Sequence, residues 1–309
     1  MVPSQMDGYF VSNEYPTFDH NGDRVLPPYL RWLFSVPSVW RDVAIGSKGM
    51  GDRRQRVHPE QVLAFAAPLP ALDEQRRIVA RLDRVAALVE ARRQEIATSE
   101  AEMQVLLSKA FARAVDGAPR RPMDEVAPLV RRPVAIELDS RYPELGVRSF
   151  GRGTFHKPSL LGTEVGTKKL FEIAAGDLLF NIVFAWEGAV AIAQHKDAGR
   201  VGSHRFLTCV TDPEIATADF LLFYFLTSEG HLCLGEASPG GAGRNRTLGL
   251  KKLENIEVPV PPLENQRWFD RLQAKARQLR SVRAETAKDV DALIPALLHE
   301  VFNGKDRAA

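Results

Sequence analysis

The sequence has few of the features that mark metal-binding, secreted or membrane proteins. Only two of its 309 residues are cysteines, Cys209 and Cys233, and neither belongs to a CxxC pair or a Cys/His cluster. This scarcity argues against a zinc site and fits a reducing cytosol. No stretch reaches the roughly 18 apolar residues that a membrane span needs, and the N-terminus lacks the basic start and apolar run of a signal peptide. We therefore expect a cytoplasmic protein without a membrane partner.

Motifs of catalysis are missing as well. The chain contains no GxxxxGK[ST] loop for nucleotide phosphates and no Asn-Pro-Pro-aromatic signature of amino-methyltransferases. Glu144, Glu164 and Lys168 supply carboxylates and a lysine, but they lack the strand context of a restriction-nuclease site. The pair 203–204 with Asp212 has the residue types of a hydrolase triad without its nucleophile elbow. We expect no enzymatic activity and no cofactor.

Charges of the two signs are nearly balanced. The 41 Lys and Arg residues against 39 Asp and Glu residues give a formal net charge of +2, so any nucleic-acid-binding surface must be local. Hydrophobic residues make up 45% and charged residues 26% of the chain, which is an ordinary globular composition. The length allows about two domains.

One motif occurs twice, 191 positions apart. PLPALDEQRR contains Pro68, Pro70, Leu72 and Gln75, and PVPPLENQRW contains Pro259, Pro261, Leu263 and Gln266. Further pairs at this offset are Ser12 with Ser203, Tyr15 with Phe206, Leu30 with Leu221, Trp32 with Phe223, Arg53 with Arg244, and LLSKAF (106–111) with LLHEVF (297–302). The matched positions keep the same offset without insertions or deletions, so the chain contains two copies of one repeated unit.

The two copies are unequal in length. The second begins near Pro119, after the helix-breaking run DGAPRRP, and the counterpart of this start would precede residue 1. We therefore expect roughly the first 70 residues of the first copy to be absent. The predicted division is 1–71 for the C-terminal part of a first domain, 72–117 for a long helix, 118–262 for a complete second domain, and 263–309 for a second long helix and tail.

Each copy ends in a heptad pattern of apolar residues. The first pattern runs through Ile78, Leu82, Val85, Val89, Ile96, Met103, Leu106 and Ala110, and the second through Phe269, Ala276, Ala287, Val290, Ile294 and Leu297. A surface helix on its own domain is one interpretation, but each helix is too long for so small a domain. An antiparallel helix pair is the better interpretation. Pro295 should kink the second helix or divide it.

The segment between the helices, 120–258, has the pattern of a compact domain. Short apolar stretches such as LGVRSF, KKLFEI, DLLFNIVFAW and VAIAQH predict strands, with turns at glycines. ADFLLFYFLTSEGHLCLGEA predicts one mostly buried helix. The fold class is therefore α/β in the mixed α+β sense.

Several of these stretches resemble one known family. PLPALDEQRRIVARL and SPGGAGRNRTLGLKKLENIEVPVPPLENQR resemble the join between target-recognition domain and spacer helix in specificity (S) subunits of type I restriction–modification systems. GDLLFNIVFAWEGAVAIAQHKDAGRVGSHRFL resembles the core of such a recognition domain. The resemblance covers the chain from about residue 9. The sequence departs from the family in lacking the front half of the first recognition domain.

The resemblance implies two target-recognition domains joined by two long antiparallel coiled-coil-like helices. It also implies sequence-specific binding of double-stranded DNA at a bipartite target, with methyltransferase (M) subunits and a restriction/translocase (R) subunit as partners in DNA methylation and phage defence. The alternative is a truncated or decayed subunit that acts only as a partner-binding module, or one that needs a second chain to complete its first reader. A neighbouring reading frame for the missing half would favour a split reader, and a frameshift scar would favour decay.

A glycine-rich basic loop is the sharpest candidate for DNA contact. Residues 240–247 include Arg244, Asn245 and Arg246, and glycines let a backbone approach phosphates closely. Arginine and asparagine pair bidentately with guanine and adenine edges. The first copy has a similar loop, whose candidates are Arg53, Arg54 and Arg56. A solvated turn is the alternative, but the recurrence favours function.

Three further groups of residues are candidates. They are Arg152 with His156, Lys168 with Lys169, and Ser203 with Arg205. Ordinary exposed charges are the alternative for each. His204 fits a structural role better than a functional one, because a lone histidine is more often structural, and Trp186 fits the core better than a base-stacking platform.

Overall fold

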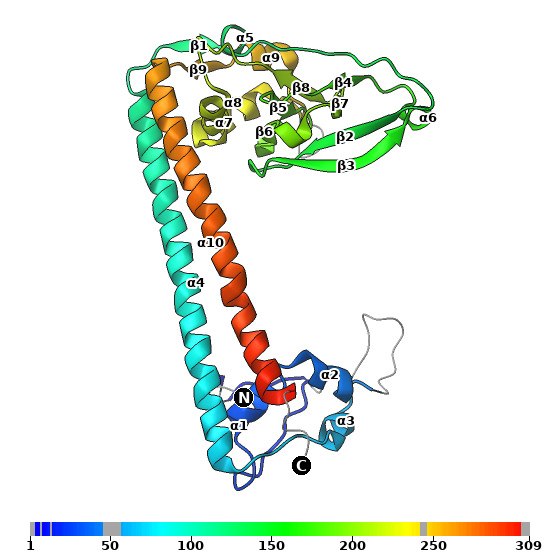
Figure 1. Ribbon diagram of the computed structural model, residues 1–309, viewed down its shortest axis with the longest axis vertical. Coiled ribbons are helices and arrows are strands. Elements are labelled where there is room, and N and C mark those ends of the chain that lie inside the picture. Colours follow the sequence, from blue (N-terminus) through cyan, green and yellow to red (C-terminus); the bar gives the residue numbers. More distant parts are fainter. Residues whose placement is uncertain (1–3, 7, 13, 46–56, 242–245, 304–309) are drawn as a thin grey trace. The chain divides into compact units, whose positions relative to one another are not determined.

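The computed structural model describes residues 4–6, 8–12, 14–45, 57–241 and 246–303. The chain divides into unit 1, residues 1–102 and 278–309, and unit 2, residues 103–277. Two long helices, α4 (Leu72–Val115) and α10 (Leu263–Asn303), contribute to both units (Figure 1). None of the described helices combines the length and the apolar character needed to cross a membrane.

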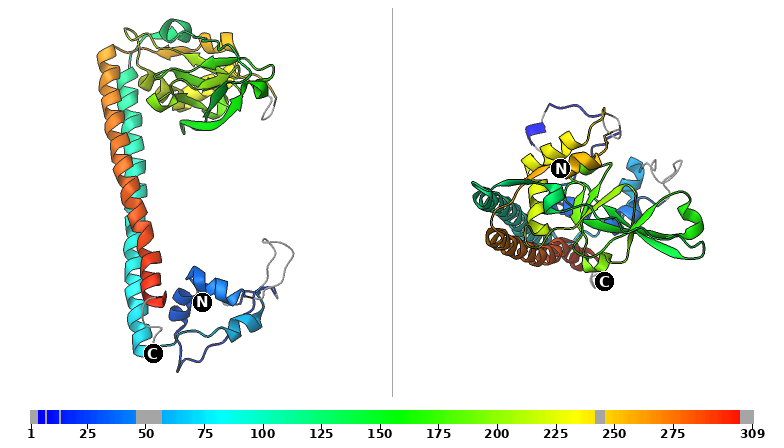
Figure 2. Two further views of the ribbon diagram at one scale, coloured as in Figure 1. Left: turned by 45° about the vertical axis from the view of Figure 1, so that its right-hand side comes forward. Right: turned by 90° about the horizontal axis from the view of Figure 1, so that it is seen from above.

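Within each unit the two long helices run antiparallel. In unit 1, Arg81 forms an ion pair with Glu300 at 3.1 Å, and Arg93 forms one with Asp291 at 2.6 Å. The residue numbers rise on α4 as they fall on α10. In unit 2 the ring of Phe111 lies 5.3 Å from the ring of Phe269, which continues the same order. Figure 2 shows the two helices side by side in a second view, and the predicted antiparallel pair is confirmed.

Two details of the helices differ from the prediction. Helix α10 continues through Pro295, so of the two predicted effects of this proline, a kink or a division of the helix, the division does not occur. A proline removes one backbone hydrogen bond, and the buried side chains of Leu297 and Phe302 hold the final turns in place. On α4, Leu106 is 53% exposed and Leu107 is buried instead, because 3.6 residues per turn drift away from a strict heptad.

Unit 2 holds all the described strands, arranged in three small sheets. The strand orders are β1 (Arg120–Pro122) with β9 (Glu257–Pro259); β3 (Thr154–Leu161), β2 (Arg141–Val147), β7 (Val201–Ser203), β4 (Leu170–Glu172); and β6 (Val190–Ile192), β5 (Leu178–Asn181), β8 (Phe206–Cys209). The short helices of this unit are α5 (Met123–Val126), α6 (Gly162–Val165), η2 (Ala185–Glu187), η3 (His195–Asp197) and α9 (Leu250–Glu254). The predicted mixed α/β domain is confirmed.

The segment predicted as one buried helix is two helices, α7 (Ala218–Leu226) and α8 (Ser228–Ala237). Thr227 separates them: its hydroxyl donates to the Tyr224 carbonyl at 2.7 Å and accepts from the Gly230 amide at 3.2 Å. A Cβ atom on Gly230 would lie 2.1 Å from the Tyr224 oxygen, so this tight break requires glycine. A side chain that bonds to nearby backbone competes with a continuous helix.

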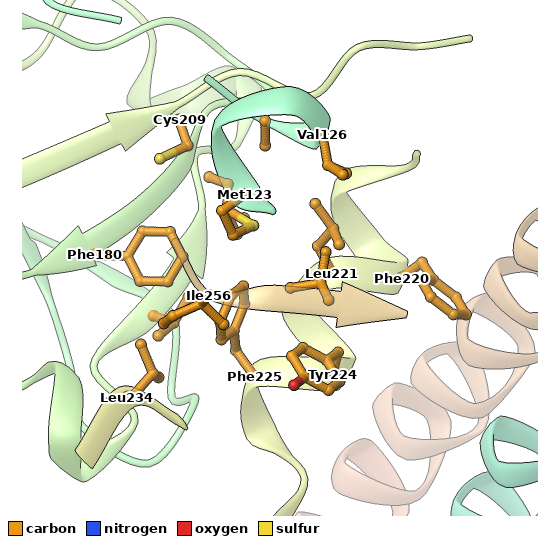
Figure 3. Close-up of a cluster of buried hydrophobic side chains, with 14 of the residues drawn as sticks. Met123, Val126, Phe180, Cys209, Phe220, Leu221, Tyr224, Phe225, Leu234 and Ile256 are labelled. Carbon is orange, nitrogen blue, oxygen red and sulfur yellow. The ribbon is translucent and has the colours of Figure 1, made fainter. Parts of the chain in front are cut away.

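Helix α7 lies between a sheet and the long helices of unit 2. On one side, the ring of Phe225 meets the ring of Phe180 from β5 edge to face at 5.1 Å (Figure 3). On the other side, Phe220 lies 5.1 Å from Phe111 of α4. Phe180, Phe220 and Phe225 are fully buried, and burying a phenylalanine stabilises a fold by about 1.5–3 kcal/mol.

Unit 1 repeats the helices of unit 2 with the same spacing. Besides η1 (Ser4–Met6), it contains α1 (Pro27–Leu33), α2 (Pro37–Val43) and α3 (Pro59–Ala64). The starts of α1, α2, α3 and α4 precede those of α7, α8, α9 and α10 by 191 positions each. This agreement confirms the repeat that the sequence predicts.

Equivalent helices of the two copies start by different local chemistry. Helices α1 and α2 begin with Pro27 and Pro37, whose fixed φ suits the first helical position and whose missing amide hydrogen is not needed there. Helices α7 and α8 follow Thr217 and Thr227, whose hydroxyls accept hydrogen bonds from the Phe220 and Gly230 amides. The position of each helix start is therefore kept while its capping residue changes.

A buried glutamine joins the start of α4 to the chain that leads into α1. The Gln75 side-chain oxygen accepts a hydrogen bond from the Leu26 amide at 2.9 Å. Its side-chain nitrogen donates to the carbonyls of Arg24 at 2.9 Å and Pro70 at 2.8 Å. Gln75 is fully buried, so each of these three bonds satisfies a group with no access to bulk water.

The same three bonds occur 191 positions later in unit 2. The Gln266 oxygen accepts from the Thr217 amide at 3.0 Å, and its nitrogen donates to the carbonyls of Ile215 at 2.9 Å and Pro261 at 2.8 Å. Gln266 is also fully buried. The glutamine shared by PLPALDEQ and PVPPLENQ therefore makes the same buried hydrogen-bonded link, which we call the bracket, in both units.

We expect Gln266→Ala to destabilise unit 2 strongly. The substitution leaves an amide and two carbonyls without their partner, at about 1–3 kcal/mol for each group that stays unsatisfied. Gln278→Ala, at an exposed position on the same helix, is the matched control and should change stability little. Calorimetric unfolding of both variants tests this; equal melting temperatures would show that the bracket does not stabilise the unit.

Candidate nucleic-acid interface

The end of β5 and the η2 turn, residues 181–188, form a segment on which several candidate residues converge. The Ile182 amide donates to the Arg205 carbonyl at 2.8 Å, and the Ile182 carbonyl accepts from the Leu248 amide at 2.9 Å. The turn that carries Arg205 and the chain that follows Arg246 are therefore bonded to this one residue. We call residues 181–188 the anchor segment.

Arg246 is held in place by the anchor segment and by α8. Its Nη2 donates to the Gly235 carbonyl at 2.8 Å, and its Nε donates to the Ser238 carbonyl at 3.3 Å. The guanidinium also lies over the Trp186 ring at 5.0 Å. A cation near the last carbonyls of a helix is favourable, so this arginine has a structural role at the end of α8.

Trp186 is half-buried in the anchor segment. Its indole nitrogen donates to the Val183 carbonyl at 3.1 Å, and Arg246 lies over its ring. The tryptophan therefore packs within the domain, in agreement with the interpretation that it is not an open stacking platform.

The tip of the β2–β3 hairpin is bonded to the other end of the anchor segment. The Phe150 and Gly151 amides donate to the carbonyls of Glu187 at 2.8 Å and Gly188 at 2.9 Å. Gly151 and Gly188 have φ values of 62° and 72°, and a Cβ atom on Gly151 would lie 2.6 Å from Leu226. Glycine at these positions lets the tip come this close, and the exposed Arg152 follows directly.

The two lysines and Ser203 lie at one end of the four-stranded sheet. Leu170 of β4 pairs with Ser203 of β7, so Lys168 and Lys169 precede this pair on one strand and Arg205 follows it on the other. Both lysines and Arg205 are exposed, and Ser203 accepts a weak hydrogen bond from the Arg205 amide at 3.4 Å. The sheet register thus brings together two groups that are more than 30 residues apart in the sequence.

His156 is engaged within the domain. Its Nε2 lies 2.8 Å from an oxygen of Asp197, a fully buried carboxylate that also accepts from the Thr154 hydroxyl at 2.8 Å. Burial alone raises the pKa of Asp197, but hydrogen bonds from the Gln194 amide, His156 and Thr154 outweigh it and hold this pKa below its ordinary value. His156 therefore links β3 to η3 through its contact with the Asp197 carboxylate.

The remaining candidates are Arg53, Arg54, Arg56, Arg244 and Asn245, and they lie outside the described residues. The stretch DLLFNIVFAW predicts a strand followed by a turn at Gly188, and both occur, with β5 at Leu178–Asn181 and Gly188 directly after η2. The sequence did not predict that the strand ends at Asn181 or that other segments bond to residues 181–188. Within the described ranges, no group of three or more His, Cys, Asp or Glu side chains could hold a metal ion.

Comparison with known proteins shows the fold. No family model and no curated protein matches the chain. The crystal structure of the HsdS subunit from Thermoanaerobacter tengcongensis matches with 22% identity and a TM-score of 0.50, covering 91% of this chain and 71% of that one. A chain from a structural study of complex assembly and conformational transition of the type I R-M system matches with 21% identity and a TM-score of 0.62, covering 91% and 72%. The chain therefore has the fold of type I specificity subunits, as the sequence resemblance predicts.

We expect Arg246 and Arg152 to differ in their effect on stability. Arg246→Ala removes a half-buried guanidinium from two carbonyls and an indole ring and should cost about 1–2 kcal/mol. Arg152→Ala removes an exposed side chain from the hairpin tip and should cost less than about 0.5 kcal/mol. Calorimetry without DNA measures both. A loss for Arg152→Ala as large as that for Arg246→Ala would contradict these assignments.

Proposed function

We propose that the chain is the DNA-reading specificity subunit of a type I restriction–modification complex. In this role it directs methyltransferase and restriction subunits to a bipartite target and contributes no chemistry of its own. The observation that carries the proposal is the gathering of exposed Arg152 and Arg205 around one anchored segment, on a fold shared with HsdS.

The anchoring suits sequence reading. A side chain that reads a base edge must be held in a narrow range of positions, and backbone hydrogen bonds from ordered segments supply that constraint. The backbone of Gly151, directly before Arg152, and the backbone of Arg205 itself are hydrogen-bonded to the anchor segment. Their planar guanidinium groups can donate bidentately to guanine or to phosphate. Lys168 and Lys169 are compact charges and suit phosphate contacts.

The glycine-rich loop is part of the proposed surface. Arg244 and Asn245 precede Arg246, whose guanidinium is fixed to α8 and Trp186. We propose that Arg246 sets the position from which its two neighbours reach DNA. In the first copy, we propose that Arg53, Arg54 and Arg56 contact DNA in the same way.

Exposed apolar side chains on the long helices support partner binding. Leu88, Val105 and Leu106 on α4, and Leu279, Val282 and Leu293 on α10, are at least half exposed. Apolar side chains that stay in water favour a protein partner. We propose that methyltransferase subunits cover them and that the restriction subunit joins this assembly. A module that binds partners through these helices without reading DNA is the second candidate function.

The test compares Arg152 and Arg205 with a control, Arg141, which lies at the other end of the β2–β3 hairpin from Arg152. The chain is co-purified with its methyltransferase subunit, and bound sequences are selected from a pool of randomised duplexes. For the selected duplex, Arg152→Ala or Arg205→Ala should weaken binding by about 1–3 kcal/mol if the arginine reads a base. Arg141→Ala, exposed at the open end of the same hairpin, should leave the affinity unchanged.

A salt series separates base contacts from phosphate contacts. Lys168→Ala and Lys169→Ala should weaken all duplexes alike and lower the slope of log K against log salt by about one each. If the complex assembles but selects no sequence, or if no variant changes its affinity, the partner-binding module is the correct function.

A further inference from the structure

Six apolar positions differ in burial between the two units. In unit 2, Leu221, Phe225, Leu248, Leu253, Ile256 and Val258 are buried in the main core. The residues 191 positions earlier in unit 1 are Leu30, Phe34, Val57, Val62, Phe65 and Ala67. They are apolar at all six positions, yet each is only partly buried. We call the stretch from α7 to β9 in unit 2, and the equivalent stretch from α1 to residue 68 in unit 1, the helical half of each unit. At these six positions the helical half of unit 1 is as apolar as that of unit 2 but is less deeply buried.

Unit 2 shows what covers this surface. Phe180 of β5 and Met123 of α5 face Phe225 and Ile256 of the helical half (Figure 3). The Met123 amide also donates to the Ile256 carbonyl at 3.0 Å. We call residues 118–199 of unit 2, which contain β1 to β6, the strand half.

Backbone pairing shows the same contrast. Strand β9 of unit 2 pairs with β1 of the strand half in the register Arg121 with Val258. Its equivalent in unit 1, residues 66–68, forms neither helix nor strand. Strands β7 and β8 of unit 2 pair with β2, β4 and β5 of the strand half.

The segment equivalent to β7 and β8 is apolar and open to solvent in unit 1. Phe10, Tyr15 and Phe18 are 99%, 68% and 46% exposed, and their equivalents Val201, Phe206 and Cys209 are 3%, 6% and 2% exposed. Phe206 packs in a cluster with residues of the strand half such as Leu145 and Leu179. Exposed aromatic side chains at the places of buried strand residues mark a surface that a partner covers.

We propose that unit 1 binds a different polypeptide chain, not a second copy of this one, that carries a strand half equivalent to residues 118–199. The partner would add strands to residues 10–12, 15–18 and 66–68, and its apolar face would pack on the partly buried residues of α1 and α3. This is strand addition combined with apolar packing. The proposal rests on the proposed function, since the partner would complete a second DNA reader.

A separate chain fits because the receiving surface is already formed. Unit 1 has a core of its own, in which Tyr29, Leu33 and Leu82 are almost fully buried, and Gln75 makes all three of its bracket bonds. The strand half of this chain is engaged in unit 2, and its removal would expose Phe225. A preformed surface keeps the entropic cost of binding low.

The test measures whether a strand half protects residue 15. A copy of residues 118–199 is joined in register to residue 9, with a protease site at the junction, because the equivalent turn at Gly199 is exposed. Tyr15→Cys is placed in this fusion and in the unfused chain, and maleimide labelling at residue 15 is followed by mass spectrometry. We expect labelling at least about tenfold slower in the fusion, before and after cleavage. A copy carrying Phe180→Asp is the matched control and should restore fast labelling.

Each other outcome overturns the proposal. Equal labelling in a folded fusion means that the strand half does not cover the surface. Fast labelling after cleavage means that the cover must be covalently attached and is not a separate chain. Slow labelling of the unfused chain that depends on its concentration means that a second copy is the occupant. The assay contains neither DNA nor a methyltransferase subunit, so its failure leaves the proposed function untouched.

A second measurement decides the question if the fusion does not fold. In the unfused chain, Phe10→Ser and Tyr15→Ser should leave the melting temperature unchanged and reduce the binding of a hydrophobic dye. A lower melting temperature would show that these side chains pack within the chain itself, which would overturn the proposal.

Discussion

A buried glutamine carboxamide joins the start of each long helix to the chain directly before α1 in unit 1 and before α7 in unit 2. Gln75 and Gln266 each satisfy one amide and two carbonyls, and the three partners of one lie 191 positions from those of the other. The bracket fixes where α4 and α10 begin relative to α1 and α7. The other end of each long helix is fixed by an aromatic contact: Phe302 lies 5.5 Å from Tyr29, and Phe111 lies 5.1 Å from Phe220. Tyr29 lies 191 positions before Phe220, and Phe111 lies 191 positions before Phe302, so the two contacts are equivalent.

The scaffold was predictable because it depends on residues that recur at a fixed spacing. The repeated PxPxLxxQ motif supplies the proline carbonyl, the helix start and the bracket glutamine within residues 68–75 and again within 259–266. The heptad pattern predicts the long helices, since burial of one helical face depends on the period alone. The local chemistry around them is less constrained, because α1 and α2 start with a proline at the first helical position, whereas α7 and α8 start after a capping threonine.

The candidate site was predictable only as a set of basic residues. Its arrangement depends on tertiary contacts that have no local signal, such as the bonds from Ile182 to Arg205 and Leu248. The continuity of α10 through Pro295 has the same origin, because the packing of its final turns outweighs the local preference. The break between α7 and α8 is instead local, since the Thr227 hydroxyl bonds to the backbone of Tyr224 and Gly230. Arg246 has the residue type expected of a DNA contact, yet its guanidinium is bonded to the end of α8.

The two units share one helical scaffold, and only unit 2 carries described strands. Under the proposed function, unit 2 is therefore the unit that we expect to read DNA. The most direct test of this claim maps modified bases at single-base resolution in cells that express the partner methyltransferase with or without this chain. The account predicts methylation at a defined motif only when the chain is present, and loss of that motif when Arg152 and Arg205 are both replaced by alanine. An identical methylation pattern with and without the chain would contradict it.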